Sequence, residues 1–244
     1  MNSVIVRNMS KAFKDKVIFK DFSIEIEKNT VHAIVGSNGS GKTSLLRILT
    51  GLYNKDSGEV TVKGTHSMLL ENDYLYEDKT GIENLKLYGL YFGYNLEKYK
   101  EFSDLLGLTG DLDRKVSTYS KGMKRKLSLL IIILMDRDII FLDEATSGVD
   151  PISRVEIRKI ISILKKREKT VIITSHDLSE IEKVADFVSM VKDGELLFTK
   201  NISEIEGESL EDLFIEEGLK WMRRKMLGKP LDFIFLEVRM LSYQ

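Results

Sequence analysis

Short apolar runs predict the core of this chain. Residues 31–35, 139–142 and 171–174 are compact and mostly apolar or β-branched, the pattern of strands buried on both faces of a parallel sheet. Between the last two runs, apolar residues recur at helical spacing over residues 157–164. Strands that alternate with helices in this way predict an α/β fold with right-handed crossovers.

Two further stretches differ from this core. Within the first thirty residues, runs such as residues 22–27 alternate between apolar and charged positions, which predicts an antiparallel sheet with one solvated face. From about residue 80 to residue 126 the pattern is helical throughout. We therefore predict a mostly parallel core sheet, an N-terminal antiparallel β subdomain and an inserted α-helical subdomain.

Composition is that of a globular protein without a global attraction to polyanions. Lys and Arg number 37 against 38 Asp and Glu, so any contact with nucleic acid or anionic lipid has to be local. Cysteine is absent, which excludes disulfides and thiolate metal sites. The longest apolar stretch, residues 127–135, is far shorter than the ~20 residues of a membrane-spanning helix, and it predicts a buried helix. No secretory signal opens the sequence, so the cytoplasm is the expected compartment.

One glycine-rich motif carries specific chemistry. Residues 36–43 satisfy the pattern G-x-x-x-x-G-K-[ST] between a predicted strand and a predicted helix, which makes the core a P-loop NTPase core. Backbone N–H groups of such a loop face phosphate oxygens, Lys42 adds a full positive charge, and Thr43 places a hydroxyl on Mg²⁺. The residues predicted to bind a nucleoside triphosphate are Gly36, Ser37, Asn38, Gly39, Ser40, Gly41, Lys42 and Thr43.

Two carboxylates follow the apolar run at residues 139–142. Asp143 and Glu144 come at the carboxyl end of a predicted parallel strand, which is the edge where open α/β sheets bind ligands. Asp143 suits a water-mediated contact with Mg²⁺, and Glu144 suits the polarisation of an attacking water. Beside the phosphate loop, this pair predicts a site for hydrolysis of ATP.

Together these residues resemble the ATP-binding cassette family, the nucleotide-binding subunits of ABC transporters, up to about Phe214. Residues 119–123 stand where the family has its L-S-G-G-Q signature, residues 147–150 resemble its D-loop, and His176 follows a strand as the family's switch histidine does. The resemblance implies ATP and Mg²⁺ as ligands, with two cassettes closing head to tail around two ATP molecules.

The resemblance also implies roles for single residues. Ser120 and Gly122 would contact the γ-phosphate of ATP bound to the other subunit, with Asp150 in the adjoining D-loop. His176 would sense the γ-phosphate, and Phe13 would stack on adenine.

Several positions depart from the family pattern, among them Ala145, where the family often has Pro. Lys121 replaces the first glycine of the signature pair and Met123 replaces its Gln, a variant that resembles cassettes of drug, antibiotic and bacteriocin exporters. The Gln that contacts Mg²⁺ and water aligns best with Glu71, although Asn72 is one residue away. Glutamate oxygens still suit Mg²⁺, so Glu71 is the predicted third metal contact.

The resemblance implies a groove at the edge of the helical subdomain that receives the membrane subunit. Aromatic and apolar side chains near this edge either line that contact or form the core of the subdomain. They are Tyr74, Leu75, Tyr76, Tyr88, Tyr91 and Phe92.

We predict a nucleotide-binding domain over residues 1–217 and a C-terminal extension over residues 218–244. The charge changes sign at this boundary, since residues 203–217 hold seven acidic and no basic residues, whereas residues 218–244 hold six basic and two acidic ones. Trp221 and the basic residues after it, with the apolar residues 233–236, form either an amphipathic helix against a membrane or permease, or an extra helix packed on the domain.

The resemblance implies an ATPase subunit of an ABC exporter. Its partners would be a transmembrane permease subunit and a second cassette, identical or different, with peripheral attachment to the cytoplasmic face of the cell membrane and no nucleic acid. Three alternatives remain: a cassette ATPase that acts on nucleic acid or ribosomes, a P-loop kinase of small molecules, and a hydrolysis-poor ATP-gated module in which Glu71 and Lys121 impair the site.

Overall fold

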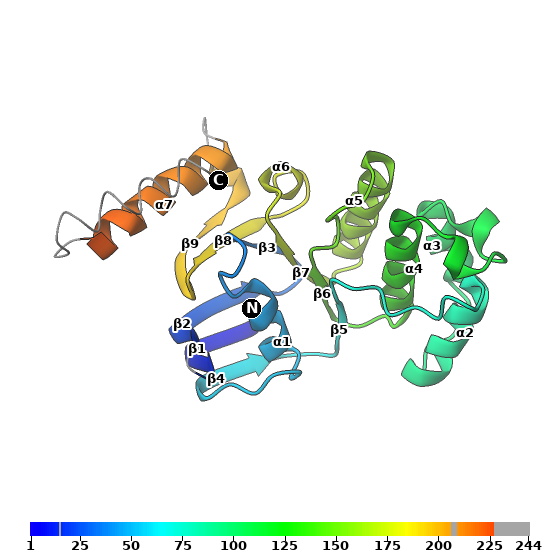
Figure 1. Cartoon of the computed structure of the whole chain (residues 1–244), viewed down its shortest axis with the longest axis horizontal. Coiled ribbons are helices and arrows are strands. Elements are labelled where there is room, and N and C mark those ends of the chain that lie inside the picture. Colours follow the sequence, from blue (N-terminus) through cyan, green and yellow to red (C-terminus); the bar gives the residue numbers. More distant parts are fainter. Residues whose placement is uncertain (15, 206–208, 227–244) are drawn as a thin grey trace. The chain divides into compact units, whose positions relative to one another are not determined.

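The computed structural model describes residues 1–14, 16–205 and 209–226 of the chain. It divides into two units, Met1–Glu204 and Ile205–Gln244, and each is described by itself. The first unit contains both sheets and every element of the candidate site (Figure 1).

The core of the first unit is a six-stranded sheet in which five neighbouring strands are parallel (Figure 1). Its order is β5 (His66–Leu69), β6 (Ile139–Asp143), β7 (Thr170–Ser175), β3 (Val31–Val35), β8 (Phe187–Lys192) and β9 (Glu195–Asn201). Only β9 is antiparallel to its neighbour. All positions of β3, β6 and β7 are buried, which confirms the strands predicted from continuous apolar runs.

A second, three-stranded sheet is antiparallel, as the alternating pattern predicts. Its order is β2 (Lys16–Glu27), β1 (Asn2–Phe13) and β4 (Ser57–Val62). Inward residues of this sheet, such as Met9 and Phe19, pack in one core with α1 (Lys42–Leu49) and with Phe141 of the parallel sheet. The antiparallel sheet is thereby fixed beside the segment that follows β3.

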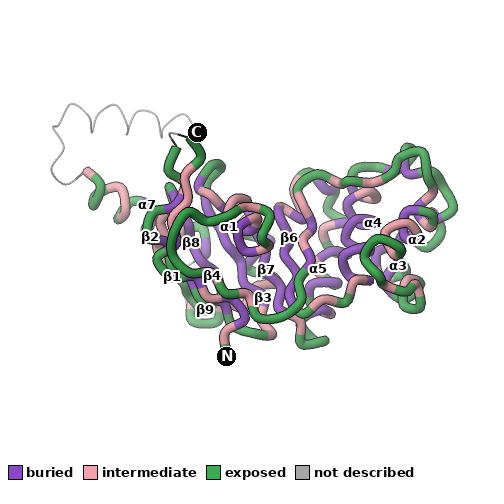
Figure 2. The backbone as a smooth tube through the Cα atoms, turned by 90° about the horizontal axis from the view of Figure 1, so that it is seen from below, coloured by how far each residue is buried: buried purple, intermediate pink, exposed green. Residues whose placement is uncertain are grey.

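The predicted helical insertion is present between β5 and β6. It contains α2 (Gly81–Phe92), α3 (Tyr99–Leu105) and α4 (Lys121–Leu134), which lie together at one end of the unit (Figure 1). The first of them begins with a capping box between Thr80 and Glu83. The last is buried along most of its length, which confirms the buried helix predicted near residues 127–135 (Figure 2).

Two helices follow β6 and β7, the strands whose carboxyl ends lead to Glu144 and His176. The helix α5 (Pro151–Lys166) begins after Asp150, which caps it, and it carries the predicted apolar stripe Ile157, Ile160, Ile161 and Leu164 on its buried face. The short α6 (Leu178–Ile181) begins after Asp177 and leads to β8. Both helices follow the carboxyl ends of β6 and β7, and the residues just after these strands, Glu144 and His176, line the cleft described below.

The second unit contains α7 (Leu210–Met226), which passes through position 218, where the sequence analysis places the start of an extension. Acidic residues occupy its first turn, and Arg223, Arg224 and Lys225 occupy its last, which matches the helix dipole. The predicted amphipathic residues 233–236 lie outside the described residues. Within residues 1–14, 16–205 and 209–226, no helix is long and apolar enough to cross a membrane.

One histidine lies inside the parallel sheet. His32 of β3 is 1% exposed, and its Nε2 lies 2.8 Å from Ser189 Oγ on β8. Ser189 Oγ in turn lies 2.7 Å from Thr199 Oγ1 on β9. The other ring nitrogen, Nδ1, is buried without a partner among the described residues, so a protonated ring would be poorly solvated. Burial accordingly lowers the pKa of His32 to about 4.

This histidine makes the stability of the fold depend on pH. In the unfolded chain His32 titrates near its ordinary pKa of 6.5, while the folded ring stays neutral down to about pH 4. Its contribution to the free energy of unfolding is therefore complete above pH 6.5 and is lost as the pH falls toward 4. From pH 7 to pH 5 we expect a loss of about 2 kcal/mol, measured by urea unfolding.

The substitution His32→Gln should flatten this pH dependence, because an amide does not titrate. The control His66→Gln changes an exposed histidine and should keep the wild-type slope. An unchanged slope in His32→Gln would contradict the assignment.

Candidate functional site

The phosphate loop connects β3 to α1, and two glycines fix its path. A Cβ added at Gly36 would lie 2.1 Å from the carbonyl oxygen of Val191, so no larger residue fits there. Gly41 caps α1 with a left-handed φ of 107°, and an added Cβ would lie 2.7 Å from the ring of Phe19. Close packing against β8 and β2 therefore holds both ends of the loop.

Lys42 lies in the loop with its ammonium turned back onto the backbone. Its Nζ donates to the carbonyl oxygens of Gly36 at 2.7 Å and Ser37 at 3.1 Å. Burial lowers the pKa of Lys42, and the nearby carboxylates of Glu144 and Asp143 partly offset that effect. The positive charge and the N-terminus of α1 thus face one space, which suits phosphate oxygens.

Asp143 is fully buried at the end of β6, and hydroxyl groups from two other segments bind it. Its Oδ1 accepts hydrogen bonds from Thr43 at 3.1 Å and from Thr174 of β7 at 2.6 Å. Its Oδ2 is buried and has no partner among the described residues. A buried carboxylate oxygen without a partner, beside the hydroxyl of Thr43, fits Mg²⁺ that arrives with a nucleotide.

Glu144 follows with a left-handed backbone, φ 48°, which is uncommon for a residue with a side chain. Its N–H donates to the carbonyl oxygen of Thr174 at 3.2 Å and to its hydroxyl at 3.1 Å. Its carboxylate Oε2 lies 2.9 Å from Nδ1 of His176. The backbone turn and the histidine together hold the carboxylate in a defined position.

These groups border a single cleft of about 440 Å³. Its lining comes from four separate segments of the chain, with Lys42 and Thr43 from the first, then Glu71, Glu144 and His176. The remaining lining residues are Lys16, Ile18, Asn38, Gly39, Gly41, Ser44 and Ser147. The cleft therefore combines a cationic phosphate loop, a carboxylate held by a histidine, and a second acidic residue at its edge.

Three other predicted residues form a separate cluster at the start of α4. Ser120 is exposed and caps this helix by accepting the N–H of Met123 at 3.2 Å. A Cβ on Gly122 would lie 2.7 Å from Oδ2 of Asp150, so these two segments touch. Hydrogen bonds from the N–H and hydroxyl of Ser153 lower the pKa of Asp150. In this single chain the cluster supplies no residue that lines the cleft.

Phe13 ends β1 and is 40% exposed. Tyr53 makes an edge contact with its ring at 5.2 Å, and the ammonium of Lys11 lies 4.9 Å from its centroid. The predicted stacking of adenine on Phe13 remains a prediction.

Sequence reasoning missed two residues that shape the site. Thr174 binds Asp143 and the backbone of Glu144. Its sequence signal is its place near the end of a buried parallel strand, two residues before His176. Arg125 lies five positions after Ser120 and reaches the backbone of Asp143 from α4. No local pattern marks that long-range contact.

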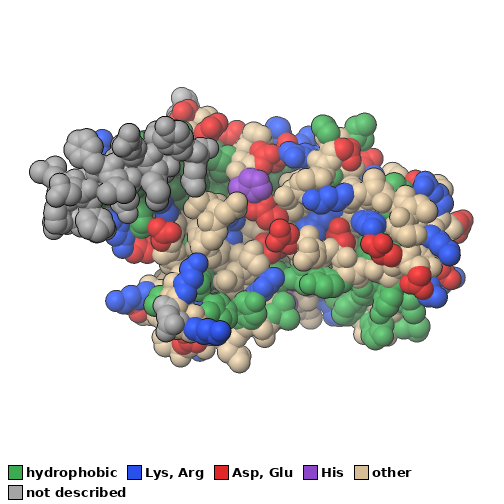
Figure 3. All heavy atoms as spheres, in the orientation of Figure 1, with side chains coloured by type: hydrophobic (Ala, Val, Ile, Leu, Met, Phe, Trp, Pro, Cys, Tyr) green, Lys and Arg blue, Asp and Glu red, His purple; other side chains and the backbone are tan. Residues whose placement is uncertain are grey.

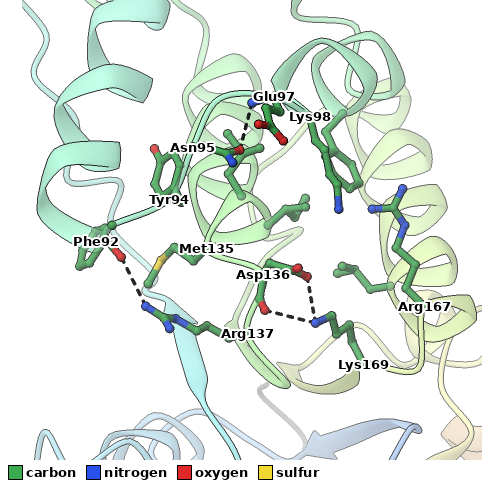
Figure 4. Close-up of a pocket in the computed structure, with 15 residues that line it drawn as sticks. Phe92, Tyr94, Asn95, Glu97, Lys98, Met135, Asp136, Arg137, Arg167 and Lys169 are labelled. Atoms are coloured by element: carbon green, nitrogen blue, oxygen red, sulfur yellow. Dashed lines mark hydrogen bonds and ion pairs between the residues drawn. The ribbon is translucent and has the colours of Figure 1, made fainter.

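A second hollow, of about 310 Å³, lies among the ends of α2, α4 and α5 (Figure 4). Within it Asp136 pairs with Lys169 at 2.9 Å, and Arg137 donates to the carbonyl oxygen of Phe92 at 3.4 Å (Figure 4). Arg167 pairs with a glutamate outside the hollow. The phosphate loop and the acidic pair do not border this hollow, so the nucleotide chemistry belongs to the first cleft.

Comparison with known proteins agrees with that chemistry. Residues 19–147, more than half of the chain, match the family described as ABC transporter. The chain belongs to this family. It is 32% identical over 230 residues to the lantibiotic transport ATP-binding protein SrtF of Streptococcus pyogenes, covering 90% of this chain and 99% of SrtF. It is 31% identical over 232 residues to the ABC transporter ATP-binding protein NatA of Bacillus subtilis, covering 86% of this chain and 94% of NatA.

A solved structure of an ATP-binding subunit of an ABC transporter shares the fold. It covers 88% of this chain and 99% of its own, with a TM-score of 0.79 at 20% identity. The predicted family and fold class are thus confirmed. The chain is an ATP-binding and ATP-hydrolysing subunit of a membrane transporter, and it works with a membrane partner and as a dimer.

The geometry of the loop predicts the effect of removing the lysine charge. Lys42→Met keeps the length of the side chain but removes the ammonium, so we expect ATP affinity to fall by about 10²-fold. Isothermal titration calorimetry measures this change. The control Lys16→Met changes an exposed lysine at the edge of the same cleft and should alter affinity by only a few-fold. Equal losses in both variants would contradict the assignment of Lys42.

Proposed function

We propose that this subunit powers an exporter, with Mg-ATP bound in the 440 Å³ cleft and hydrolysed there. The observation that carries the proposal is that Lys42 and Glu144, which His176 holds, border one cleft. Beside them, Oδ2 of Asp143 has no hydrogen-bond partner among the described residues. Export is supported by the Ser-Lys-Gly-Met signature, and a lantibiotic transport protein is among the relatives.

The phosphate loop performs the binding step in this proposal. Lys42 and the N-terminus of α1 hold the β- and γ-phosphates, and the loop glycines leave the backbone N–H groups accessible. Thr43, Asp143 and the edge residue Glu71 would hold Mg²⁺. When bound, the ion neutralises charge on the phosphate oxygens. No group of three or more carboxylate or imidazole residues forms a cation site in the described ranges, which fits an ion that takes part of its shell from the nucleotide.

Glu144 performs the hydrolytic step. Its carboxylate orients an attacking water and accepts a proton from it, and His176, directly after β7, keeps that carboxylate in place. The left-handed backbone at Glu144 lifts the side chain from the buried strand into the cleft. Strained backbone at such a position is maintained by surrounding contacts, here the two hydrogen bonds to Thr174.

The second cassette supplies the remaining contacts to ATP. Ser120 is exposed at the N-terminus of α4, where its hydroxyl and the backbone near Gly122 suit the γ-phosphate of ATP on a facing copy. Asp150 fixes this segment by its contact with Gly122. In the same arrangement, Phe13 stacks on adenine. A homodimer satisfies these needs, and a related cassette with the same motifs satisfies them equally.

An exposed apolar patch suits the permease. Leu90 is 85% exposed and Tyr91 is 71% exposed on α2, and hydrophobic side chains gather over this helix (Figure 3). Tyr74, Tyr76 and Phe92 extend the patch. In this proposal the patch contacts the membrane subunit and the cassette lies on the cytoplasmic face of the membrane. Residues 1–217 would then form the nucleotide-binding domain and residues 218–244 an extension.

Removal of the charge on Glu144 tests the hydrolytic role. Glu144→Gln keeps the shape of the side chain but does not accept a proton, so we expect turnover to fall by about 10²-fold or more while ATP still binds. The ATP-bound dimer should then accumulate. Phosphate release measures the first effect, and light scattering with size-exclusion chromatography measures the second.

The matched control is Glu25→Gln, which changes an exposed glutamate of β2 and should leave both measurements unchanged. Wild-type turnover in Glu144→Gln would reject Glu144 as the base.

A further inference from the structure

One buried guanidinium joins the two segments that carry the acidic residues of the cleft. Arg125 of α4 is only 3% exposed. Its Nη1 donates to the carbonyl oxygen of Leu70 and, at 3.3 Å, to that of Glu71, just after β5. Its Nε donates to the carbonyl oxygen of Ala145 at 3.1 Å, and its Nη2 to that of Asp143 at 2.6 Å.

These bonds hold the chain on both sides of Glu144. Asp143 precedes it, Ala145 follows it, and the same planar group binds the carbonyl oxygens of both. The left-handed backbone between them, φ 48°, needs such support. Thr174 supports it from β7, and Arg125 supports it from α4. The direction of the Glu144 side chain therefore depends on a residue outside the cleft.

The hydrogen-bond partners of Arg125 indicate that it positions the backbone more than it pairs with a charge. A buried guanidinium is unfavourable unless its N–H groups are bonded, and only one of the partners, Asp73 Oδ1 at 3.3 Å, is charged. The others are backbone carbonyls of two separate segments. Because the donors of arginine point in fixed directions, their bonds set the separation of those segments, which a lysine does not do.

We propose that Arg125 is a positioning residue for hydrolysis, which holds the segments of Glu71 and Glu144 at a fixed separation and ties both to α4. The proposal rests on the roles proposed above for Glu71 and Glu144. Since α4 begins at the Ser120 cap, a shift of this helix on closure of the dimer reaches the cleft of its own chain through Arg125.

A change at Arg125 should therefore lower the turnover of ATP without changing the affinity for ATP. None of the hydrogen bonds of Arg125 involves the phosphate loop. For Arg125→Lys we expect kcat to fall by about 10-fold or more, with the Kd for ATP within about twofold of wild type. Hydrogen exchange should become faster in residues 70–73 and 143–147 and stay unchanged in residues 36–43. The experiment uses the full chain with Mg²⁺ and ATP, a phosphate-release assay and calorimetry.

The matched control is the neighbouring buried cation of α4. Lys126 pairs with Glu156 of α5 at 2.9 Å and has no bond to either acidic segment. Lys126→Met should lower the melting temperature, because it leaves the partly buried carboxylate of Glu156 without its partner, but keep kcat within about twofold. A second comparison is Asp73→Asn, which keeps an oxygen acceptor while removing the charge, and it should also keep most of kcat.

Several results would overturn the proposal. Wild-type kcat in folded Arg125→Lys would remove the positioning role, and a raised Kd with unchanged kcat would place Arg125 in binding instead. A loss in Asp73→Asn equal to that in Arg125→Lys would make the ion pair, not the carbonyl contacts, responsible. If Arg125→Lys does not fold, Arg125→Gln, which leaves no buried charge, is measured in the same way. Wild-type kcat in Arg125→Gln would reject the proposal.

The same assays separate this proposal from the hydrolytic role of Glu144. If Glu144→Gln keeps wild-type turnover, the role of Glu144 fails whatever Arg125 does. If Glu144→Gln loses turnover and Arg125→Lys keeps it, only the positioning role of Arg125 fails.

Discussion

The buried carboxylate of Asp143 holds together the segments on which the cleft depends. It ends β6, and its Oδ1 accepts hydrogen bonds from Thr43 at the start of α1 and from Thr174 at the end of β7. Both donors are uncharged, and the second oxygen is unpaired among the described residues. A negative charge buried in this way is favourable only beside compensating charge. Lys42 supplies part of it. In the proposed function a nucleotide-bound cation would supply the rest, so the carboxylate that joins these segments would also favour Mg-ATP.

Close backbone contacts impose a second constraint, and they explain glycine at two distant motifs. Gly36 lies against the carbonyl oxygen of Val191, which fixes the phosphate loop to β8. Gly122 lies against the side chain of Asp150, which fixes the start of α4 to the cap of α5. A methyl group at either position would displace backbone or a capping carboxylate. Contacts within the protein therefore restrict the positions of the loop and of residues 119–123.

Local sequence patterns predicted β3, β6 and β7, because strands buried on both faces read as continuous apolar runs. The phosphate loop and the acidic pair followed from motifs within a few residues. The strands β8 and β9 were not predicted, since β8 includes the buried Ser189 and β9 has exposed polar positions. The contacts of Thr174 and Arg125 were also missed, because each spans tens of residues and depends on which strands and helices become neighbours. The roles of Ser120, Gly122, Asp150 and Phe13 rest on the family resemblance and remain predictions.

The positions of the two clusters explain why this ATPase works as a dimer. Glu144 and Lys42 border the cleft, whereas Ser120 is exposed at the start of α4 and is not among the residues that line it. A single chain thus keeps the cleft and the exposed start of α4 apart, and in the proposed function a facing copy brings the second to the first. The guanidinium of Arg125 lies between them on the same helix as Ser120 and binds the backbone beside Glu144. Because α4 carries both Ser120 and Arg125, the proposed contact of Ser120 with the γ-phosphate of ATP on the facing subunit would be coupled through this one helix to the backbone beside Glu144 of its own subunit.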